Sequence, residues 1–289
     1  MTRFVYLADT HLGPDALEYQ QQPACPGKAR EILRALDSWI REDGGVDLIL
    51  HGGDLVDAGT PDAIGQASEQ VRFSRPLHLC LGNHDLTGKE SLAHWLKLCP
   101  DLFPGGQPEY SIQREDCVIH VVPNHWNAIP YYWERQESAP VFFPHQMEAL
   151  RARCRAAAGR PQILLTHSPV FGLPPEQTGF SEPYHSPGEA FTRNVVNLVE
   201  SQPDIRCVLG AHNHMNMRIE RGGVHYVTTS SLIEAPFEFK VFEINGGRVS
   251  METVSLADRL PFVADYDATR AYVQGRACDR AFSHVASPN

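Results

Sequence analysis

Short apolar runs recur along the chain and alternate with segments of helical periodicity. Their length is typical of buried strands. The first six runs are Phe4–Ala8, Val46–His51, Leu77–Leu81, Cys117–Val122, Gln162–Thr166 and Arg206–Gly210. Four more follow at short spacing, namely Asn216–Glu220, His225–Thr229, Glu238–Ile244 and Arg248–Val254. Gly-containing turns at 221–223 and 245–247 join these late runs, so we predict an antiparallel meander at the end of the chain.

Helical patterns fill the gaps between the early runs. Within residues 28–42, four apolar side chains recur at helical spacing and share one face: Ile32, Leu33, Leu36 and Ile40. Thr60 and Pro61 form an N-cap and first-turn pair that opens a second helix. Further helices are predicted over 89–98, 145–157 and 189–201. This alternation of strands and helices predicts a layered α/β domain.

The predicted domain covers residues 1–254, and residues 255–289 form a C-terminal tail. We expect this tail to pack on the domain or to lie at an oligomer interface, with a short helix over 267–276. Two long irregular stretches, 123–144 and 168–188, are rich in proline and aromatic residues. Loops of that length inside a compact domain usually form the walls or lids of functional sites.

The overall composition narrows the class of protein. Of the 289 residues, 42% are hydrophobic, which is too many for a disordered chain. The 25 Lys and Arg residues are outnumbered by 35 Asp and Glu residues, so the formal net charge is −10. That acidity argues against nucleic acid or an anionic membrane as a partner.

The cysteines and the apolar runs bear on the cellular compartment. The seven cysteines are scattered without a CxxC pair, which favours reduced thiols over a disulfide framework. No stretch approaches the ~20 apolar residues that span a bilayer. The apolar run at residues 4–8 is too short for the hydrophobic region of a signal peptide. The sequence therefore predicts a cytoplasmic protein without a membrane partner.

Five short polar clusters each follow directly after a predicted strand. They are Asp9-Thr10-His11, residues 53–57, Gly82-Asn83-His84-Asp85, Thr166-His167 and His212-Asn213-His214. In an α/β sheet, that position is the carboxyl edge, where loops converge on a ligand. Separate segments of the chain can therefore deliver their side chains to one site.

Seven residues of these clusters have side chains that bind transition metals: Asp9, His11, Asp54, Asn83, His167, His212 and His214. Imidazole, carboxylate and amide groups suit Zn, Mn, Fe or Co. Seven ligands exceed what one ion takes while keeping a position open, so the set predicts two ions that share a bridging carboxylate. Two divalent ions, less two carboxylates and a bridging hydroxide, leave the site near roughly +1, which favours an anion such as phosphate.

The ordered series DxH, GDxxD, GNHD, a lone His after a strand, and HxH resembles the calcineurin-like metallophosphoesterases over roughly residues 3–245. The resemblance implies an α/β fold, an αββα sandwich of two mixed β-sheets flanked by helices. It implies metal ligands as follows: Asp9, His11 and His214 for one ion, Asn83, His167 and His212 for the other, and Asp54 between both. His84 would then be catalytic, contacting the phosphate, and Asp85 would orient His84.

One position departs from the family pattern. A Gly usually precedes the HxH pair, but this chain has Ala211. A methyl group there tightens the turn and removes no ligand, so we expect the site to remain active.

Other residues each allow two interpretations. Asp57 could support the metal shell or cap a turn. His125 could line the substrate pocket or pack in the core, while His185 and Arg193 could bind the phosphate or cap a helix. Aromatic residues of the first long loop could stack on a flat leaving group or anchor the loop: Trp126, Tyr131, Tyr132, Trp133, Phe142 and Phe143.

The motifs predict the reaction class more sharply than the substrate. The segment Leu7–Leu12, and Gln146 in a predicted helix, resemble class III cyclic nucleotide phosphodiesterases. We therefore expect a metal-dependent phosphodiesterase that hydrolyses a small organic phosphodiester through a metal-bridging hydroxide.

Three alternatives stay open. The metal ligands do not distinguish phosphate monoesters from phosphate diesters, so a phosphomonoesterase fits the same motifs. Residues 11–13 and 53–61 also resemble repair-type nucleases, although the net charge of −10 opposes that function. A non-catalytic metal-binding scaffold is the third alternative, although such a scaffold would typically lose His84 or the bridging ligand. A homo-oligomer is compatible with each function.

Overall fold

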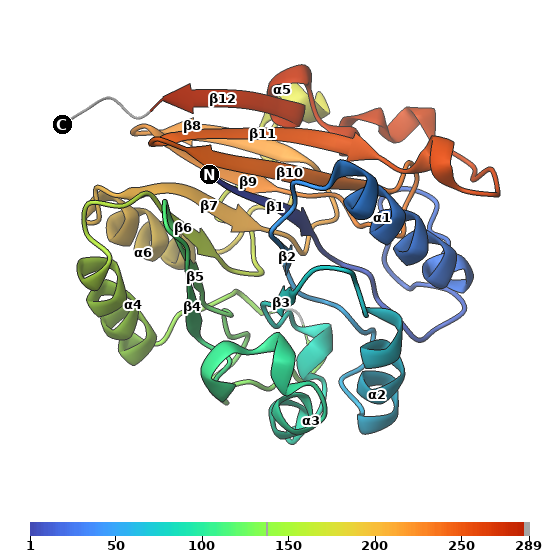
Figure 1. Cartoon of the computed structure of the whole chain (residues 1–289), viewed down its shortest axis with the longest axis horizontal. Coiled ribbons are helices and arrows are strands. Elements are labelled where there is room, and N and C mark those ends of the chain that lie inside the picture. The colour runs from blue at the N-terminus through green and yellow to red at the C-terminus, as the bar shows by residue number, and fades with distance from the viewer. Residues whose placement is uncertain (137, 286–289) are drawn as a thin grey trace.

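A computed structural model of the protein describes residues 1–136 and 138–285 and contains two six-stranded β-sheets that share one apolar core (Figure 1). The first sheet has the order β12-β11-β10-β1-β2-β3. Its strands are β1 (Thr2–Leu7), β2 (Leu48–His51), β3 (Leu77–Leu79), β10 (Glu238–Asn245), β11 (Arg248–Ser255) and β12 (Ala281–Val285). Strands β1, β2 and β3 are parallel, whereas β10, β11 and β12 pair antiparallel to their neighbours.

The second sheet has the order β4-β5-β6-β7-β9-β8. Its strands are β4 (Tyr110–Gln113), β5 (Val118–Val121), β6 (Gln162–Leu165), β7 (Ile205–Gly210), β8 (Met217–Arg221) and β9 (Val224–Thr228). The four central strands are parallel, and the two edge strands, β4 and β8, are antiparallel.

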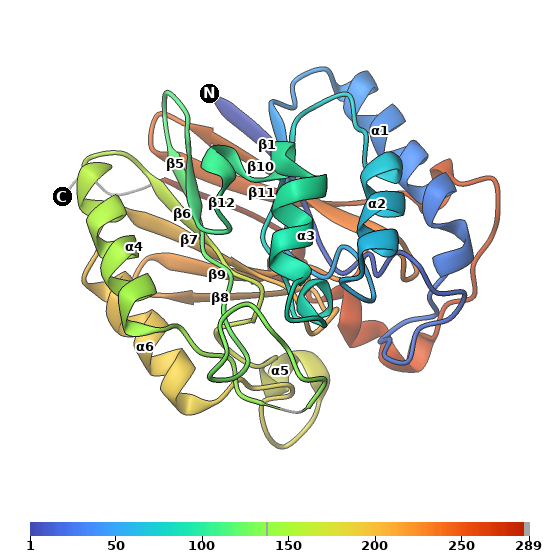
Figure 2. The same cartoon turned by 90° about the horizontal axis from the view of Figure 1, so that it is seen from below.

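The helices flank the two sheets on opposite sides (Figure 2). They are α1 (Ala29–Asp43), α2 (Pro61–Gln70), α3 (Ser91–Leu98), α4 (Pro144–Ala156), α5 (Pro175–Thr178), α6 (Glu189–Glu200) and α7 (Ala277–Arg280). Short 3-10 helices cover Pro26–Lys28, His84–Leu86, Pro100–Leu102, Pro104–Gly106, Ala257–Arg259 and Ala268–Gln274. Among the described residues, no helix combines the length and the apolar character needed to cross a membrane.

Alternation along the strands explains the layers. In β6, Ile163 and Leu165 belong to the core between the sheets, whereas Leu164 belongs to a second cluster with residues of α4 and α6. A strand covered on both faces is apolar at every position, which is why β6 appears in the sequence as a continuous apolar run.

The predicted α/β fold of two mixed sheets flanked by helices is confirmed. Two strands were not predicted, because β4 and β12 are short edge strands that each contain polar residues and so do not appear as apolar runs. The predicted meander is wrong in its connectivity. The β8–β9 and β10–β11 hairpins belong to different sheets, and β9 pairs parallel with β7. Over the predicted helix at 267–276, the structure has a 3-10 helix.

Candidate metal centre

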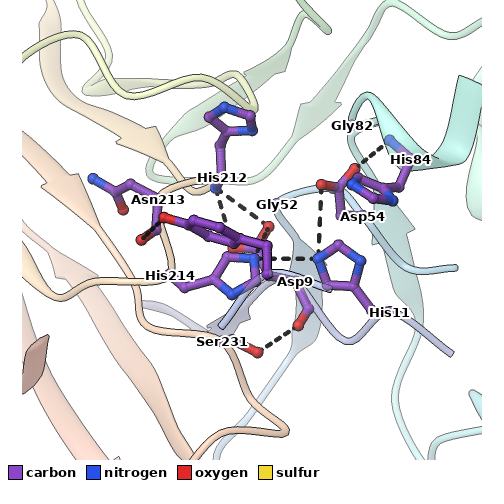
Figure 3. A network of polar contacts seen from close by, with 12 residues as sticks. Asp9, His11, Gly52, Asp54, Gly82, His84, His212, Asn213, His214 and Ser231 are labelled. Carbon is purple, nitrogen blue, oxygen red and sulfur yellow. Dashed lines mark hydrogen bonds and ion pairs between the residues drawn. The ribbon is translucent and has the colours of Figure 1, made fainter. Parts of the chain in front are cut away.

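The five polar clusters meet in one place, at the ends of β1, β2, β3, β6 and β7. Figure 3 shows residues of four of these clusters, among them Asp9, Asp54 and His212. Three groups of side chains each bring their ligand atoms within 4.8 Å of one another. The groups are Asp9, His11 and His214; Asp54, His167 and His212; and His11, Asp57 and His84. The clusters come from segments far apart in the sequence, and the fold brings their side chains together.

The first group matches the predicted ligands of one ion. His11 Nε2 lies 3.2 Å from His214 Nε2, and His214 Nε2 lies 3.8 Å from Asp9 Oδ1. All three side chains are buried. Two neutral imidazoles can place at most one N–H proton between these facing nitrogens. A metal ion bound at this position would use the lone pairs of both nitrogens.

The second group matches the predicted ligands of the other ion. His167 Nε2 lies 3.2 Å from both Asp54 Oδ2 and Asn83 Oδ1. His212 Nδ1 lies 3.0 Å from the same Asn83 oxygen. Asp54 Oδ2 is also 3.9 Å from His11 Nε2, so this carboxylate faces both groups as a bridging ligand would.

Outer hydrogen bonds set which imidazole nitrogen faces the centre. His167 Nδ1 donates to the carbonyl oxygen of Gly52 at 2.8 Å, and His214 Nδ1 donates to Glu234 Oε1 at 2.5 Å. In the neutral rings, these bonds leave Nε2 with its lone pair toward the site. The donor set therefore fits two transition-metal ions, since ligating His residues usually donate their other N–H to an oxygen acceptor.

The backbone is strained where it carries the ligands. Asp9, His11, Asp54, His212 and His214 have φ between 40° and 70°, in the left-handed region. Such conformations cost of order 1–3 kcal/mol each and gather at functional sites. Gly53 adds a close approach, because a Cβ there would lie 2.3 Å from His167 Nδ1. Ala211, the departure from the family pattern, is buried between the two ligand segments without displacing a ligand.

Burial and neighbouring charges perturb the ionisable groups. Burial raises the pKa of Asp54, but the imidazoles of His167 and His84 outweigh it and hold that pKa well below its usual range. Burial lowers the pKa of His167, but Asp54 outweighs it and brings the pKa to about 9. Burial and His167 both lower the pKa of His212. Metal binding at such a site must displace the proton of His167, because only a neutral imidazole is a ligand.

Glu234 is a site residue that the sequence analysis missed. It is 2% exposed, and besides His214 it accepts hydrogen bonds from the backbone N–H groups of Gln21 and Gln22, at 3.0 and 2.7 Å. The nearby Tyr19 packs its ring against His214 with centroids 4.9 Å apart. The available signal was an acidic residue inside the otherwise apolar segment 232–237.

The structure changes the expected relation between His84 and Asp85. Asp85 was expected to orient His84, but its carboxylate accepts hydrogen bonds from the backbone N–H groups of Gly82, Leu55 and Val56. His84 Nδ1 instead donates to the Asp57 carbonyl oxygen at 2.9 Å, with Asp57 Oδ1 3.3 Å away. Asp57 Oδ1 also lies 3.4 Å from His11 Nδ1, so Asp57 contacts both His84 and His11. Asp85 joins the two loops that carry Asp54 and Asn83.

Of the remaining candidate residues, some pack in the interior and others line a cavity. His125 is buried and stacks on Phe143, and Gln146 holds the same loop by donating to Glu109 and to the Pro123 carbonyl oxygen. Phe142 belongs to the core near α6. Trp126 and Trp133 line a cavity beside the metal centre, as does His185, whereas Arg193 lines a different cavity.

Two adjoining cavities open at the centre. The inner cavity, of about 190 Å³, is lined by His11, Tyr19, Asp54, Asn83, His84, Trp133, His185, His212 and His214. The outer cavity, of about 600 Å³, shares Asn83, Trp133, His185 and His212 with it. The other described residues that line the outer cavity come from 126, 135–136, 138–140, 168–169, 186–188 and 213. This arrangement provides a small chamber at the candidate metal ligands and a larger one beside it.

Such a site defines the class of metal-dependent phosphoesterases, and comparison with known proteins agrees. Residues 2–216 match the family described as calcineurin-like phosphoesterase. The chain belongs to this family, and the buried His/Asp groups are consistent with its dimetal site. The comparison with curated proteins found no match.

Solved structures share the fold at low sequence identity. A dimetal phosphatase from Danio rerio is 16% identical with a TM-score of 0.69, covering 88% of this chain and 96% of its own. A purple acid phosphatase from yellow lupin is 14% identical with a TM-score of 0.61, covering 99% of this chain and 57% of its own. GAP50, an anchor in the inner membrane complex of Plasmodium, is 13% identical with a TM-score of 0.60, and the match covers 92% of this chain and 87% of GAP50. At these identities the likeness concerns the fold.

Proposed function

We propose that this dimetal phosphoesterase is a phosphodiesterase that hydrolyses a small organic phosphodiester. The observation that carries the proposal is the pair of adjoining cavities. The inner cavity of about 190 Å³ accommodates a phosphoryl group beside the candidate ligands, and the outer cavity of about 600 Å³ provides room for an ester substituent.

The charge of the inner cavity supports a diester over a monoester. None of the described residues that line it is a Lys or Arg. A phosphate monoester presents up to two negative charges near neutral pH, whereas a diester presents one. With only the metal ions and His84 to balance charge, the monoanionic diester is the better match.

When bound, two transition-metal ions would polarise the phosphoryl oxygens and acidify the attacking water. One ion would be held by Asp9, His11 and His214, and the other by Asn83, His167 and His212. Both ions would be ligated by Asp54. His84 keeps a proton on Nδ1 through the Asp57 carbonyl oxygen, so its Nε2 is the atom available to the substrate. Burial lowers the pKa of His84, but Asp54 and Asp57 outweigh it and raise that pKa to about 9, so the ring also carries a proton on Nε2 near neutral pH. That proton would be donated to a phosphoryl oxygen or to the leaving oxygen as the P–O bond breaks.

Likeness within the family bears on the substrate. The segment Leu7–Leu12 resembles class III cyclic nucleotide phosphodiesterases, and we include cyclic nucleotides among the candidate diesters. Gln146 adds nothing to this choice, since it fixes the loop at residues 123–143 and does not line either cavity. We propose a small phosphoester as the partner rather than nucleic acid, because the net charge is −10.

The test compares bis(p-nitrophenyl) phosphate with p-nitrophenyl phosphate. Chelated enzyme is re-supplied with Mn, Zn, Fe or Co, and metal content is measured beside the rate. Metal-dependent preference for the diester supports the proposal. Preference for the monoester would assign a phosphatase, and no turnover in folded protein with both sites filled would assign a non-catalytic scaffold.

A further inference from the structure

We propose that His185 is a specificity-determining residue, which accepts a hydrogen bond from a hydroxyl group on the ester substituent of the substrate. This inference rests on the proposed function and deepens it, because it names the chemical class of the substituent. The acceptor would be Nδ1 of the imidazole, at the place where the inner and outer cavities adjoin. A substituent that carries its hydroxyl a few atoms from phosphorus would reach this atom.

The first observation is the position of His185 between the two cavities. Four of the described residues line both cavities, and two of these, Asn83 and His212, are candidate metal ligands. The other two are Trp133 and His185, one from each of the two long loops. A substituent of a phosphoryl group in the inner cavity would pass these two side chains as it extends into the outer cavity. They are therefore placed to select the substituent.

The two side chains differ in the polar atoms that they offer. Trp133 donates its Nε1–H to the Gln136 carbonyl oxygen at 3.1 Å, and its ring packs against His84 with centroids 4.9 Å apart. His185 is exposed, and none of the described residues donates a hydrogen bond to its Nδ1. The polar group available at the boundary between the cavities is therefore the imidazole of His185.

Hydrogen bonds at the Tyr19 hydroxyl determine which nitrogen of this imidazole is free. Tyr19 Oη lies 3.3 Å from the Asn213 carbonyl oxygen and 3.2 Å from His185 Nε2. Gln21 Nε2 donates to the same hydroxyl at 2.5 Å. The hydroxyl has one proton and the carbonyl oxygen can only accept, so Tyr19 donates to Asn213 and accepts from His185. In the neutral ring of His185 the proton is then on Nε2, which leaves the lone pair on Nδ1.

The backbone and a neighbouring ring hold His185 in this place. Its φ is 52°, in the left-handed region, a strained conformation that gathers at functional sites when the residue is not glycine. Tyr184 packs edge-on against the imidazole with centroids 4.4 Å apart. Tyr184 also exchanges two backbone hydrogen bonds with Leu173, which ties this part of the second long loop together. An acceptor held in this way loses little freedom when a substrate binds.

Three p-nitrophenyl phosphodiesters with substituents of equal length test the inference. The 3-hydroxypropyl ester carries a terminal hydroxyl, the butyl ester carries a methyl group in its place, and the 2-methoxyethyl ester is polar but cannot donate. With metal-loaded enzyme at about pH 8, where an imidazole of ordinary pKa is neutral, we expect kcat/KM for the hydroxyl-bearing ester to be about threefold to tenfold above both others. Turnover in isotopically labelled water verifies that water, and not the hydroxyl of the probe, attacks phosphorus.

Variants of His185 separate hydrogen bonding from a general effect on the site. His185→Phe keeps a ring but has no acceptor, so the preference should disappear, chiefly through KM for the hydroxyl-bearing ester. His185→Asn tolerates the left-handed backbone and keeps an acceptor oxygen, so it should retain part of the preference. The control is His145→Ala in the exposed start of α4, which lines neither cavity and should leave the preference intact.

Several results would overturn the inference. They are equal kcat/KM for the three esters in wild type, a methoxy ester as good as the hydroxyl-bearing one, a preference that survives His185→Phe, and a loss in His185→Asn as complete as that in His185→Phe. Failure of the proposed function looks different. Metal-loaded wild type would then hydrolyse none of the three esters, and the inference would fall with the function on which it rests.

Discussion

His84 is the residue at which metal binding and catalysis can be separated. Its Nδ1 is held by Asp57, and it lines the inner cavity without belonging to either predicted metal-ligand set. We predict that His84→Ala keeps both metal ions and lowers kcat by about a hundredfold or more, the usual contribution of a positioned proton donor. Metal analysis and steady-state kinetics on the same preparation check both parts.

The exposed His145 at the start of α4 offers a matched control, and His145→Ala should change neither quantity. Loss of a metal ion from His84→Ala, with the rate per bound metal pair preserved, would instead make His84 a ligand or a support.

Glu234 would act on a bound metal ion through His214, to which it is hydrogen-bonded. Its carboxylate fixes the ring that faces the centre, and it also holds the backbone of Gln21 and Gln22, next to the loop residue Tyr19. We predict that Glu234→Gln weakens metal binding by about tenfold to a hundredfold, as loss of an outer partner of a ligating imidazole usually does. Competition with a chelator of known affinity measures this directly. Unchanged affinity would limit Glu234 to holding the loop.

At the scale of elements, the loops after the strands carry the strain that shapes the site. Gly53 has φ of 112°, and a Cβ there would lie 2.3 Å from His167 Nδ1. We predict that Gly53→Ala destabilises the protein by about 2 kcal/mol or more and impairs metal binding, since it adds backbone strain to overpacking. Chemical denaturation and metal titration provide the two measurements.

Gly65 in α2 is the control for this prediction. A Cβ there meets nothing within 4 Å, so Gly65→Ala should stabilise the helix by roughly 0.5–1 kcal/mol. If both variants shifted stability in the same direction, the strain argument for Gly53 would be wrong.

The sequence predicted those elements whose signal is local. Strands such as β6, buried on both faces, appear as apolar runs, and the polar clusters that follow them identified every member of the His/Asp groups at the centre. The contacts that these residues make with other loops were harder to predict from the sequence. The contact of His214 with Glu234 and that of Asp57 with His84 each depend on how separate loops meet. In neither pair does a sequence motif indicate which residue the partner is.

The connectivity of the last strands escaped prediction for a similar reason. Local turn signals identify the β8–β9 and β10–β11 hairpins, but they contain nothing about which sheet each hairpin joins. The crossing segment at residues 232–237 is largely apolar and buried, and it takes the chain from the second sheet to the first.

For the molecule as a whole, the C-terminal tail connects the two sheets along one edge. β12 extends the first sheet by pairing with β11, and Asp279 in α7 accepts a hydrogen bond from the N–H of Arg218 in β8 of the second sheet. Asp279 also contributes its carbonyl oxygen to Lys240 of β10, whose Nζ lies 3.3 Å away. The amine of Lys240 is thus enclosed where the tail meets the first sheet.

Lys240 makes the stability of the whole fold depend on pH. Burial lowers its pKa from 10.5 to about 7, with Glu238 opposing the shift and Arg280 adding to it. Between these pH values the unfolded chain binds a proton that the folded protein lacks, so the contribution of Lys240 to the free energy of unfolding rises with pH, by up to about 1.4 kcal/mol per pH unit. Below pH 7 both states are protonated and this contribution is constant.

We predict that Lys240→Met removes this slope. Metal-saturated wild type and variant are unfolded in urea from pH 7 to 9, and the difference between their unfolding free energies is followed. Thiols, phenols and the metal centre titrate alike in both proteins, so the difference isolates Lys240. The stability of the variant relative to wild type should fall steadily as the pH rises, because only the wild type gains. A difference that stays constant over this range would mean that Lys240 keeps its proton in the folded protein, held by Thr253 Oγ1 and the Asp279 carbonyl oxygen.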